Sequence, residues 1–396
     1  MLDFGRLIEQ IQLVGRESFD QRVPLAELMA RAEKAYTTAC ENGGKFEQRL
    51  KANATTVLWP LAVPLEPLAE AIKLPEPEDN ITVMAVDGSQ IMPSQHEIHS
   101  CFLLNIGFVQ LAYGTKSPPV LESFPHLYHK KEELYPLVDR RRLHIDELYV
   151  SLERNLLEFE YLIKRISQAK EIGQPVLAML DGSLIPWSSE RMPESYQKRY
   201  LERWSTIMRV FQEEQVPIVG YISHSRSSEL INDLRVSTCP YEESRCKEHC
   251  GDLNEEEFPC SAIWPVSDRT MLGRILPDDY RTVAFLSGAS VSRSFPEDMR
   301  FCFLYLNLKD EIARIEFPRW ILSDKQRFDT ALGAVLSQVR KGMGYPVALA
   351  EAHHLAVIKG NDRKQFFDLL TRHLVLIGAS HVAISPKEKK KRVGLV

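Results

Sequence analysis

Two stretches of the sequence decide the fold: MAVDGSQ at 84–90 and AMLDGSL at 178–184. In each, a short apolar run stops at an Asp-Gly-Ser tripeptide, the pattern of a buried strand that ends at a turn. Asp87 and Asp181 are therefore predicted at strand ends, where a side chain can project past the sheet into a cleft. If the two strands are neighbours, the two carboxylates converge. The simpler alternative is that Asp-Gly, a common turn pair, closes two unrelated strands.

Strand-like and helix-like segments alternate around these stretches. Short apolar runs predict strands at 81–86, 101–113, 175–180 and 216–222. Helical periodicity is found at 139–170, 196–213, 324–341, 346–357 and 362–375. Two further runs, 301–308 and 311–317, predict a hairpin. Alternation of this kind is typical of an α/β domain.

Composition shifts along the chain suggest the domain boundaries. Residues 1–78 are predicted as an N-terminal helical arm that ends in the Pro- and acid-rich segment KLPEPEDN at 73–80. An α/β domain then spans 79–380 and carries a cysteine-rich insertion at 237–265. A basic tail follows at 381–396.

The composition excludes several classes of protein. With 396 residues, 44% hydrophobic and 26% charged, the chain is typical of a globular protein of two domains or one large one. The net charge of −5 argues against a histone-like coat of positive charge, although a local basic cleft can still bind nucleic acid. No apolar run is long enough to span a membrane, and the N-terminal residues lack the pattern of a signal peptide. The expectation is a soluble, cytoplasmic protein.

A third carboxylate is expected from the helix before the second tripeptide. Converging carboxylates repel one another, and Mg²⁺ or Mn²⁺, which prefer hard oxygen ligands, would remove that cost. The apolar stripe of this helix runs through Tyr149, Leu152, Leu156, Phe159, Ile163 and Ile166. Glu160 falls about 70° from the centre of the stripe and Glu158 about 130°. Glu160 is therefore the predicted ligand, and Glu158 is expected to face solvent. The alternative is that Glu160 pairs with Lys164.

The segment GYPVALAEAHHLAVI at 344–358 adds two further polar side chains. His353 can bind a metal or move a proton near neutral pH, and the Tyr345 hydroxyl can orient a phosphate or a water. On a helix, His353 and His354 point about 100° apart, so at most one of them faces a cleft. The alternative is a core helix with a polar rim.

Four cysteines gather in the insertion: Cys239, Cys246, Cys250 and Cys260. In a reducing compartment, clustered thiols indicate a structural Zn²⁺ or an iron–sulfur cluster more than disulfides. The spacing lacks the usual CxxC pairs, and the alternative is a flexible acidic loop with unpaired thiols. The other cysteines, Cys40, Cys101 and Cys302, are expected in the core.

Taken together, the chain resembles the NurA nuclease family, which acts at DNA double-strand breaks. The resemblance covers roughly residues 80–375. It rests on the two DGS tripeptides, a glutamate on the intervening helix, ARIEFP at 313–318, and Gly-Tyr-Pro with Ala-His eight residues after the tyrosine. It implies an RNase H-like mixed sheet flanked by helices. It also implies a Mn²⁺-dependent 5′-to-3′ exonuclease that also cuts single strands. Such a protein is a homodimer and resects DNA ends with a hexameric HerA-type ATPase.

The resemblance also assigns roles to residues. Asp87 and Asp181 match the metal-binding carboxylates, and Tyr345 and His353 match a late active-site pair, with His353 a further metal ligand. Glu160 is the choice for the helix carboxylate, with Glu158 as runner-up. The N-terminal arm and the cysteine-rich insertion depart from the family pattern, which leaves open how DNA or a motor docks there.

Two other functions remain open at this stage. One is a non-catalytic DNA-end scaffold or partner subunit with a vestigial site, and the other is a phosphatase for small phosphoesters. The sequence holds no Walker-type motif, so ATP hydrolysis by the protein alone is not expected. Arg314 and Arg226 are candidates for phosphate contacts, and an ordinary surface salt bridge is the favoured interpretation of Arg226.

Overall fold

The computed structural model describes residues 2–20, 22–93, 100–143 and 145–377. The predicted basic tail at 381–396 therefore lies outside the described residues. The chain divides into two compact units. Unit 1 comprises Met1–Leu74, Ile222–Arg293 and Arg300–Glu316, and unit 2 comprises Pro75–Tyr221, Ser294–Met299 and Phe317–Val396.

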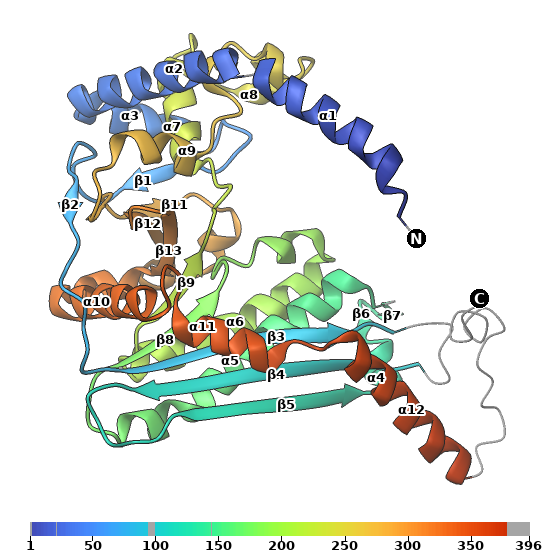
Figure 1. Ribbon diagram of the computed structural model, residues 1–396. Helices are drawn as coiled ribbons and strands as arrows, with labels where there is room; N and C mark the ends of the chain where they lie inside the picture. Colours follow the sequence, from blue (N-terminus) through green and yellow to red (C-terminus); the bar gives the residue numbers. More distant parts are fainter. Residues whose placement is uncertain (1, 21, 94–99, 144, 378–396) are drawn as a thin grey trace. The chain divides into compact units, whose positions relative to one another are not determined.

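Unit 2 contains a mixed sheet with the strand order β9–β8–β3–β4–β5. The strands are β3 (Thr82–Ile91), β4 (Phe102–Ala112), β5 (Val120–Tyr128), β8 (Val176–Asp181) and β9 (Ile218–Ile222). β8 is parallel to both β3 and β9, whereas β4 is antiparallel to β3 and to β5. This order, with its antiparallel second strand, confirms the expected RNase H-like mixed sheet (Figure 1).

Burial explains which strands the sequence revealed. Most residues of β3, β8 and β9 are buried, so these strands read as continuous apolar runs. In β5, intermediate and exposed residues alternate along VLESFPHLY, and Pro125 is tolerated because the strand lies at the sheet edge. For this reason the sequence pattern gives no signal for β5.

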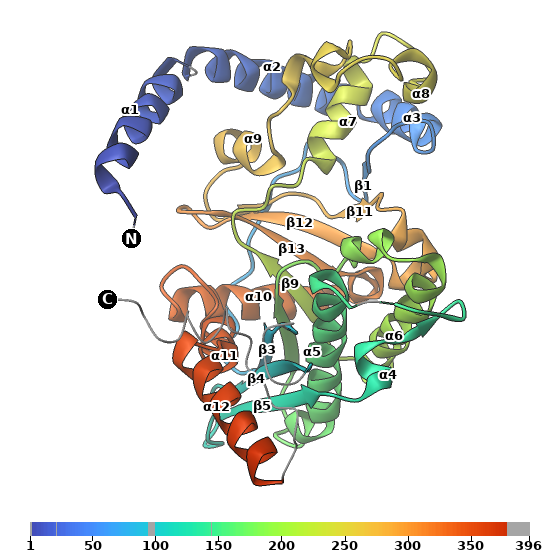
Figure 2. The same ribbon diagram turned by 90° about the vertical axis from the view of Figure 1, so that its right-hand side faces the viewer.

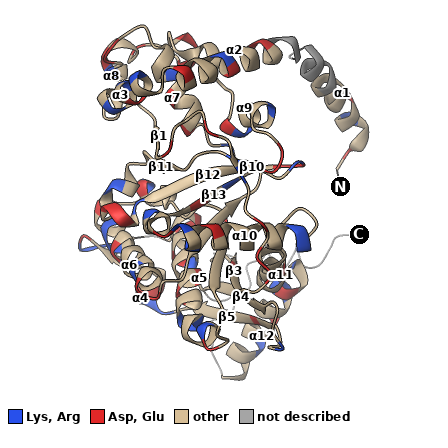
Figure 3. Ribbon diagram, turned by 90° about the vertical axis from the view of Figure 1, so that its left-hand side faces the viewer, with Lys and Arg blue, Asp and Glu red and all other residues tan. Residues whose placement is uncertain are grey.

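Helices cover both faces of this sheet. Helix α5 (Glu147–Lys170) packs on β3, and α6 (Glu194–Glu213) packs on α5, with Phe159 and Trp204 in edge-to-face contact at 4.2 Å. Helix α11 (Val347–Ala356) packs on β3 and β4 from the opposite side (Figures 1 and 2). The remaining elements are α4 (Lys131–Leu134), β6 (Leu137–Val138), β7 (Arg141–Arg142), α10 (Lys325–Lys341) and α12 (Gly360–Leu376). Basic and acidic residues are interspersed along the helices of this unit (Figure 3).

Unit 1 joins the N-terminal helices to later parts of the chain. Its helices are α1 (Phe4–Asp20), α2 (Arg22–Glu41), α3 (Gly43–Asn53), α7 (Glu229–Thr238), α8 (Cys246–His249) and α9 (Asp268–Ile275). Its strands are β1 (Ala62–Pro64), β2 (Ile72–Lys73), β10 (Tyr280–Arg281), β11 (Phe285–Ser287), β12 (Phe301–Asn307) and β13 (Ile312–Pro318). The predicted hairpin is confirmed, because β12 and β13 are neighbours in the sheet.

The two units differ from the domain boundaries expected from the sequence, and the core of unit 1 explains the difference. Met29 and Phe46, from the N-terminal helices, share one buried cluster with Leu234, Met271 and Phe303. Residues 1–74 therefore pack with 222–293 and 300–316, where the sequence suggested a separate arm. Sequence patterns give the apolar face of a helix but not which distant segment covers it.

Arg314 does not have the position that a phosphate contact requires. Its side chain, on β13, is 1% exposed and pairs with Glu229 at 2.7 Å and with Glu316 at 2.9 Å. The guanidinium also lies 3.6 Å from the centre of the Phe303 ring. The prediction of a phosphate contact is wrong, because Arg314 is a buried cation in the core of unit 1. Arg226 is exposed on the loop before α7, and its role stays a prediction.

Among the described residues, no helix is both long enough and apolar enough to cross a membrane.

Candidate active site

The register of the sheet in unit 2 brings the two DGS aspartates together. β3 and β8 are parallel neighbours, and Val86 is paired with Leu180. Asp87 and Asp181 are the next residues on the two strands. They therefore lie side by side, since adjacent strands are about 4.8 Å apart. This arrangement confirms that the two aspartates converge. Only Asp181 lies at a strand end, however: β3 continues past Asp87 to Ile91, so the prediction that the first DGS closes its strand is wrong.

Tyr345 fixes Asp181 from the segment before α11. Its hydroxyl donates a hydrogen bond to the Asp181 carboxylate. The Tyr345 ring makes an edge-to-face contact with Tyr221, the residue paired with Asp181 on β9, at 5.6 Å between centroids. Gly182 follows with φ of 112°, a conformation open to glycine and rarely adopted by other residues, so the chain can turn away directly after the aspartate.

His353 approaches Asp87 from helix α11. Its Nδ1 lies 2.7 Å from Asp87 Oδ2. The helix is held in place at its carboxyl end by Asn105 on β4, whose side-chain amide donates to the backbone carbonyls of Leu355 and Ala356 at 3.1 and 2.8 Å. His353 and Asp87 are thus paired by two elements that are fixed to each other. His354 is exposed and points elsewhere on the helix.

Glu158, on α5, is the third carboxylate of this region. The residue is 6% exposed, and its Oε1 lies 3.2 Å from Arg154 Nε. A Cβ atom at Gly88 would be 2.4 Å from Glu158 Oε1 and would also collide with Arg154, so a larger residue at this position would require both side chains to move. Burial raises the pKa of Glu158 to about 8, with Arg154 lowering it and the carboxylates of Asp87 and Asp181 raising it further.

The prediction that Glu158 faces solvent and that Glu160 points to the interior is wrong. Glu160 is partly exposed and pairs with Arg203 at 2.8 Å, rather than with Lys164. The predicted stripe omitted four buried side chains, Val150, Leu157, Leu162 and Ala169. They widen the buried face on both sides of the stripe, so the angle from its centre does not determine which glutamate is buried. Glu158 occupies the space that a side chain at Gly88 would fill, and this contact determines which glutamate is buried next to the aspartates.

Burial is the largest influence on the carboxylates of the site, and repulsion between them adds to it. Burial raises the pKa of Asp181, and the negative charge of Asp87 raises it further, whereas Tyr345 and His353 lower it. Asp87 and Glu158 approach from opposite sides of β3, because successive residues on a strand point to opposite faces and Gly88 faces α5. Two of the three carboxylates, Glu158 and Asp181, have pKa values raised by burial and by the neighbouring charges, which is characteristic of functional sites.

The donor set fits a divalent cation in its chemistry. Carboxylate oxygens and an imidazole are suitable ligands for Mn²⁺, and a cation would relieve the repulsion among Asp87, Glu158 and Asp181. Within the described part of the chain, however, no group of three or more histidine, cysteine, aspartate or glutamate side chains is arranged to hold a metal. Asp87 is bonded to His353 and Glu158 to Arg154, so ligation would require these side chains to exchange partners.

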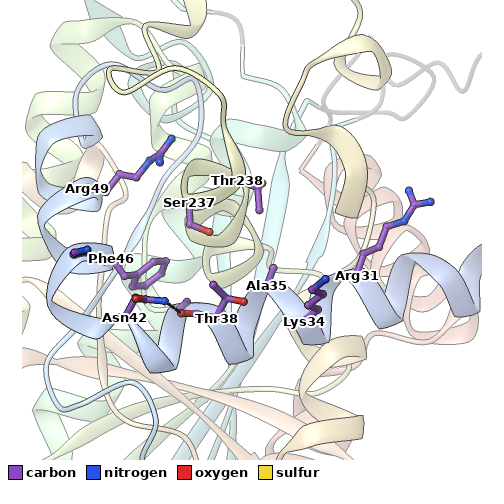
Figure 4. Close-up of a pocket in the computed structure, with 11 residues that line it drawn as sticks. Arg31, Lys34, Ala35, Thr38, Asn42, Phe46, Arg49, Ser237 and Thr238 are labelled. Carbon is purple, nitrogen blue, oxygen red and sulfur yellow. Dashed lines mark hydrogen bonds between the residues drawn. The ribbon is translucent and has the colours of Figure 1, made fainter.

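A cavity in unit 1 is separate from these carboxylates. It has a volume of about 360 Å³ and lies among α2, α3 and α7 (Figure 4). Four basic residues line it: Arg31, Lys34, Lys45 and Arg49. No carboxylate lines it, so it lacks the chemistry of the site in unit 2.

The fold and the site together define an RNase H-like α/β protein with a carboxylate centre on its two neighbouring parallel strands, β3 and β8. The chain belongs to the NurA domain family, whose sequence profile matches residues 81–358.

Several solved structures are similar to this chain. The NurA nuclease from Sulfolobus solfataricus has 12% identity and a TM-score of 0.49 over 77% of this chain and 87% of that one. A crystal structure of NurA with manganese has 10% identity and a TM-score of 0.38, over 77% and 91%. The catalytic domain of human endonuclease V has 11% identity and a TM-score of 0.30, over 83% and 98%. No curated protein matches the sequence.

Proposed function

We propose that this protein is a metal-dependent deoxyribonuclease that hydrolyses phosphodiester bonds. The observation that carries the proposal is the meeting of Asp87 and Asp181 on adjacent parallel strands, with His353 bonded to Asp87 and Glu158 buried next to both. Membership of the NurA domain family supports the same conclusion.

Each residue of the site has its own role in this proposal. Asp87 and Asp181 would hold Mn²⁺ or Mg²⁺, with Glu158 and His353 as further ligands. Such a cation supplies an activated water and neutralises the charge that develops on the phosphate. Tyr345 orients Asp181 through its hydrogen bond. His353 shares its Nδ1 with Asp87, which leaves Nε2 to take up or release a proton.

Membership of the NurA domain family supports a more specific proposal. We propose a 5′-to-3′ exonuclease that also cuts single strands and acts in DNA end resection during double-strand break repair. Its partners would be a HerA-type hexameric ATPase and a second copy of this chain.

A non-catalytic DNA-end scaffold is the second candidate function. It is favoured by one observation: the described side chains of the site are bonded to one another, and no three are arranged to hold a metal. This alternative predicts DNA binding without hydrolysis, so the two functions are separated by an activity assay.

The decisive experiment incubates the purified full chain with linear duplex and single-stranded DNA in the presence of Mn²⁺. Substrates labelled at one end report the polarity of degradation. Asp87→Asn should reduce the rate at least about 100-fold, because it removes a ligand and the partner of His353. Glu160→Gln is the matched control, since Glu160 pairs with Arg203 and should leave the rate close to that of wild type. Undiminished hydrolysis by Asp87→Asn would reject the proposal, and absence of hydrolysis in all three proteins would favour the scaffold.

A further inference from the structure

The cavity of unit 1, among α2, α3 and α7, has a positively charged lining. Arg31 and Lys34 come from α2, and Lys45 and Arg49 come from α3. The described residues that line the cavity include no carboxylate. Cations gathered in a concave site concentrate positive potential there, because the low-dielectric walls focus the field. The cavity is therefore suited to an anionic ligand.

These cations have few other partners. Arg31 lies 3.9 Å from Glu27, and both side chains are more than half exposed, so this pair is weak. Lys34 and Lys45 are exposed and form no ion pair with other described residues. Arg49 donates from Nη2 to backbone carbonyls, while its Nε is buried without a hydrogen-bond partner. A buried N–H without an acceptor is costly, and such groups often mark the place of a bound ion or water.

An apolar wall lies between the two pairs of cations. Ala35 and Ala39 on α2 and the buried ring of Phe46 on α3 form it. The two alanines follow Arg31 on successive turns of α2, so they share its face of the helix. Figure 4 shows Ala35 between Arg31 and Phe46 along α2. A wall of small side chains and one aromatic ring leaves room for a flat, apolar part of a ligand.

The end of α7 supplies hydrogen-bond acceptors on a third side. The hydroxyls of Ser237 and Thr238 both donate to the Leu234 carbonyl, at 2.7 and 3.2 Å, and each oxygen retains lone pairs that can accept. The carboxyl end of a helix also carries partial negative charge. This side of the cavity therefore suits N–H groups, such as those on the edge of a nucleobase, whereas the cations of α2 and α3 suit a phosphate.

The wall that α7 contributes is fixed by the cysteine-rich insertion. Arg235 on α7 pairs with Glu255 at 2.8 Å, and its guanidinium lies 3.8 Å from the centre of the Trp59 ring. Trp59 packs in turn against a buried cluster of Cys250, Phe258 and Cys260. The metal expected for the four cysteines stays a prediction, because no three of them are arranged to hold one among the described residues. A site with fixed walls loses little entropy when a ligand binds.

We propose that this cavity binds a nucleotide, with the phosphate on the cations of α2 and α3 and the base against the apolar wall. Its volume of about 360 Å³ lies in the range of small-ligand sites. The nucleotide is either a free mononucleotide or part of a single DNA strand, which proteins commonly bind by combining cations with an aromatic ring. The choice of DNA as a source rests on the deoxyribonuclease function proposed above, whereas the chemistry of the cavity does not.

The test measures nucleotide binding by the full chain in EDTA, where no divalent cation supports hydrolysis. A fluorescent thymidine strand of about eight nucleotides reports binding by anisotropy, and unlabelled thymidine 5′-monophosphate serves as a competitor. The cavity variant is Lys34→Ala with Lys45→Ala. The matched control is Lys51→Ala with Lys247→Ala, which removes the same charge from exposed lysines of unit 1 that do not line the cavity. All four lysines are exposed, so both variants should fold.

We expect the cavity variant to bind the strand about tenfold more weakly than wild type. The slope of log K against log salt should fall by about 1.4, because each lost phosphate contact accounts for about 0.7 on a single strand. The control should stay within about twofold of wild type. Competition by the monophosphate would support the cavity as a site for free nucleotides, and strand binding without such competition would support the strand as the ligand.

Two results would overturn the proposal: equal affinities and salt slopes for the cavity variant and the control, or no binding of either ligand by wild type. Hydrolysis in Mn²⁺, measured on the same preparations, separates this proposal from the nuclease function. Hydrolysis by wild type with unaltered strand binding by the cavity variant would reject the nucleotide site alone. Weakened binding by the cavity variant, without hydrolysis by wild type, would reject the nuclease alone.

Discussion

Replacing Glu158 with glutamine should stabilise the metal-free protein at alkaline pH and change it little at acid pH. Glu158 is buried, and its pKa is raised from an ordinary value of 4.5 to about 8. Between these two pH values the folded protein retains a proton that the unfolded chain has released. The contribution of protonated Glu158 to the unfolding free energy is therefore complete below pH 4.5. It falls as the pH rises and is lost once the pH is above about 8.

The magnitude follows from the shift. At about 1.4 kcal/mol per pH unit, this one group lowers the unfolding free energy of the wild type by about 5 kcal/mol in all, of which about 4 kcal/mol is lost between pH 4.5 and pH 8. Glutamine has no proton to retain. The difference in stability between Glu158→Gln and wild type should therefore be about 3 kcal/mol more favourable at pH 8 than at pH 5.

The assay is guanidinium unfolding of metal-free protein at a series of pH values, followed by circular dichroism. Glu160→Gln is the matched control, because this glutamate is partly exposed on the same helix and its substitution should give a nearly constant difference. A constant difference for Glu158→Gln as well would refute the burial of Glu158 next to two carboxylates. Added Mn²⁺ should stabilise wild type most at pH 8, and Glu158→Gln less.

Three further substitutions test other contacts. Tyr345→Phe removes a hydroxyl that lowers the pKa of Asp181, so the acid limb of the nuclease pH–rate profile should move to higher pH; an unmoved limb would contradict the role given to this hydrogen bond. His353→Ala should lower kcat by about 10²-fold or more while leaving the unfolding midpoint nearly unchanged, and a variant with wild-type kcat would exclude a catalytic histidine. Arg314→Met leaves two buried glutamates without their cation and should cost about 3–5 kcal/mol in guanidinium unfolding; a loss near zero would show that the pairs are not buried in solution.

The two aspartates could be located from the sequence because each follows a short, apolar, buried run, and parallel pairing of these runs places them side by side. The end of the first strand could not, since β3 continues through its DGS tripeptide to Ile91. The edge strand β5 was missed, because its alternating polar residues and Pro125 give no continuous apolar signal. Local patterns reveal buried strands better than half-exposed ones.

Helical periodicity could not identify which of Glu158 and Glu160 is buried, because the answer depends on tertiary contacts of α5. A helix packed on both a sheet and another helix has a wide buried face, and Leu162 and Ala169 extend it toward Glu158. Gly88 was the feature of the sequence that bears on this question, because a residue without a side chain lets α5 pack closely against β3. Which element fills that room is a property of the tertiary fold.

The cysteine-rich insertion shows a similar limit. The sequence grouped four thiols but gave no sign of Arg235 and Trp59, which come from α7 and from the segment after α3. Their placement depends on a core that joins residues far apart in the chain.

The central claim is that Asp87, Asp181 and Glu158 form one cation site. A crystal of the full chain soaked with Mn²⁺ tests it most directly, with data collected at the manganese absorption edge. The account predicts an anomalous peak at about 2.2 Å from carboxylate oxygens of both Asp87 and Asp181, with Glu158 turned from Arg154 toward the ion. A well-ordered site with no peak between the two aspartates, or a peak only elsewhere on the chain, would contradict it.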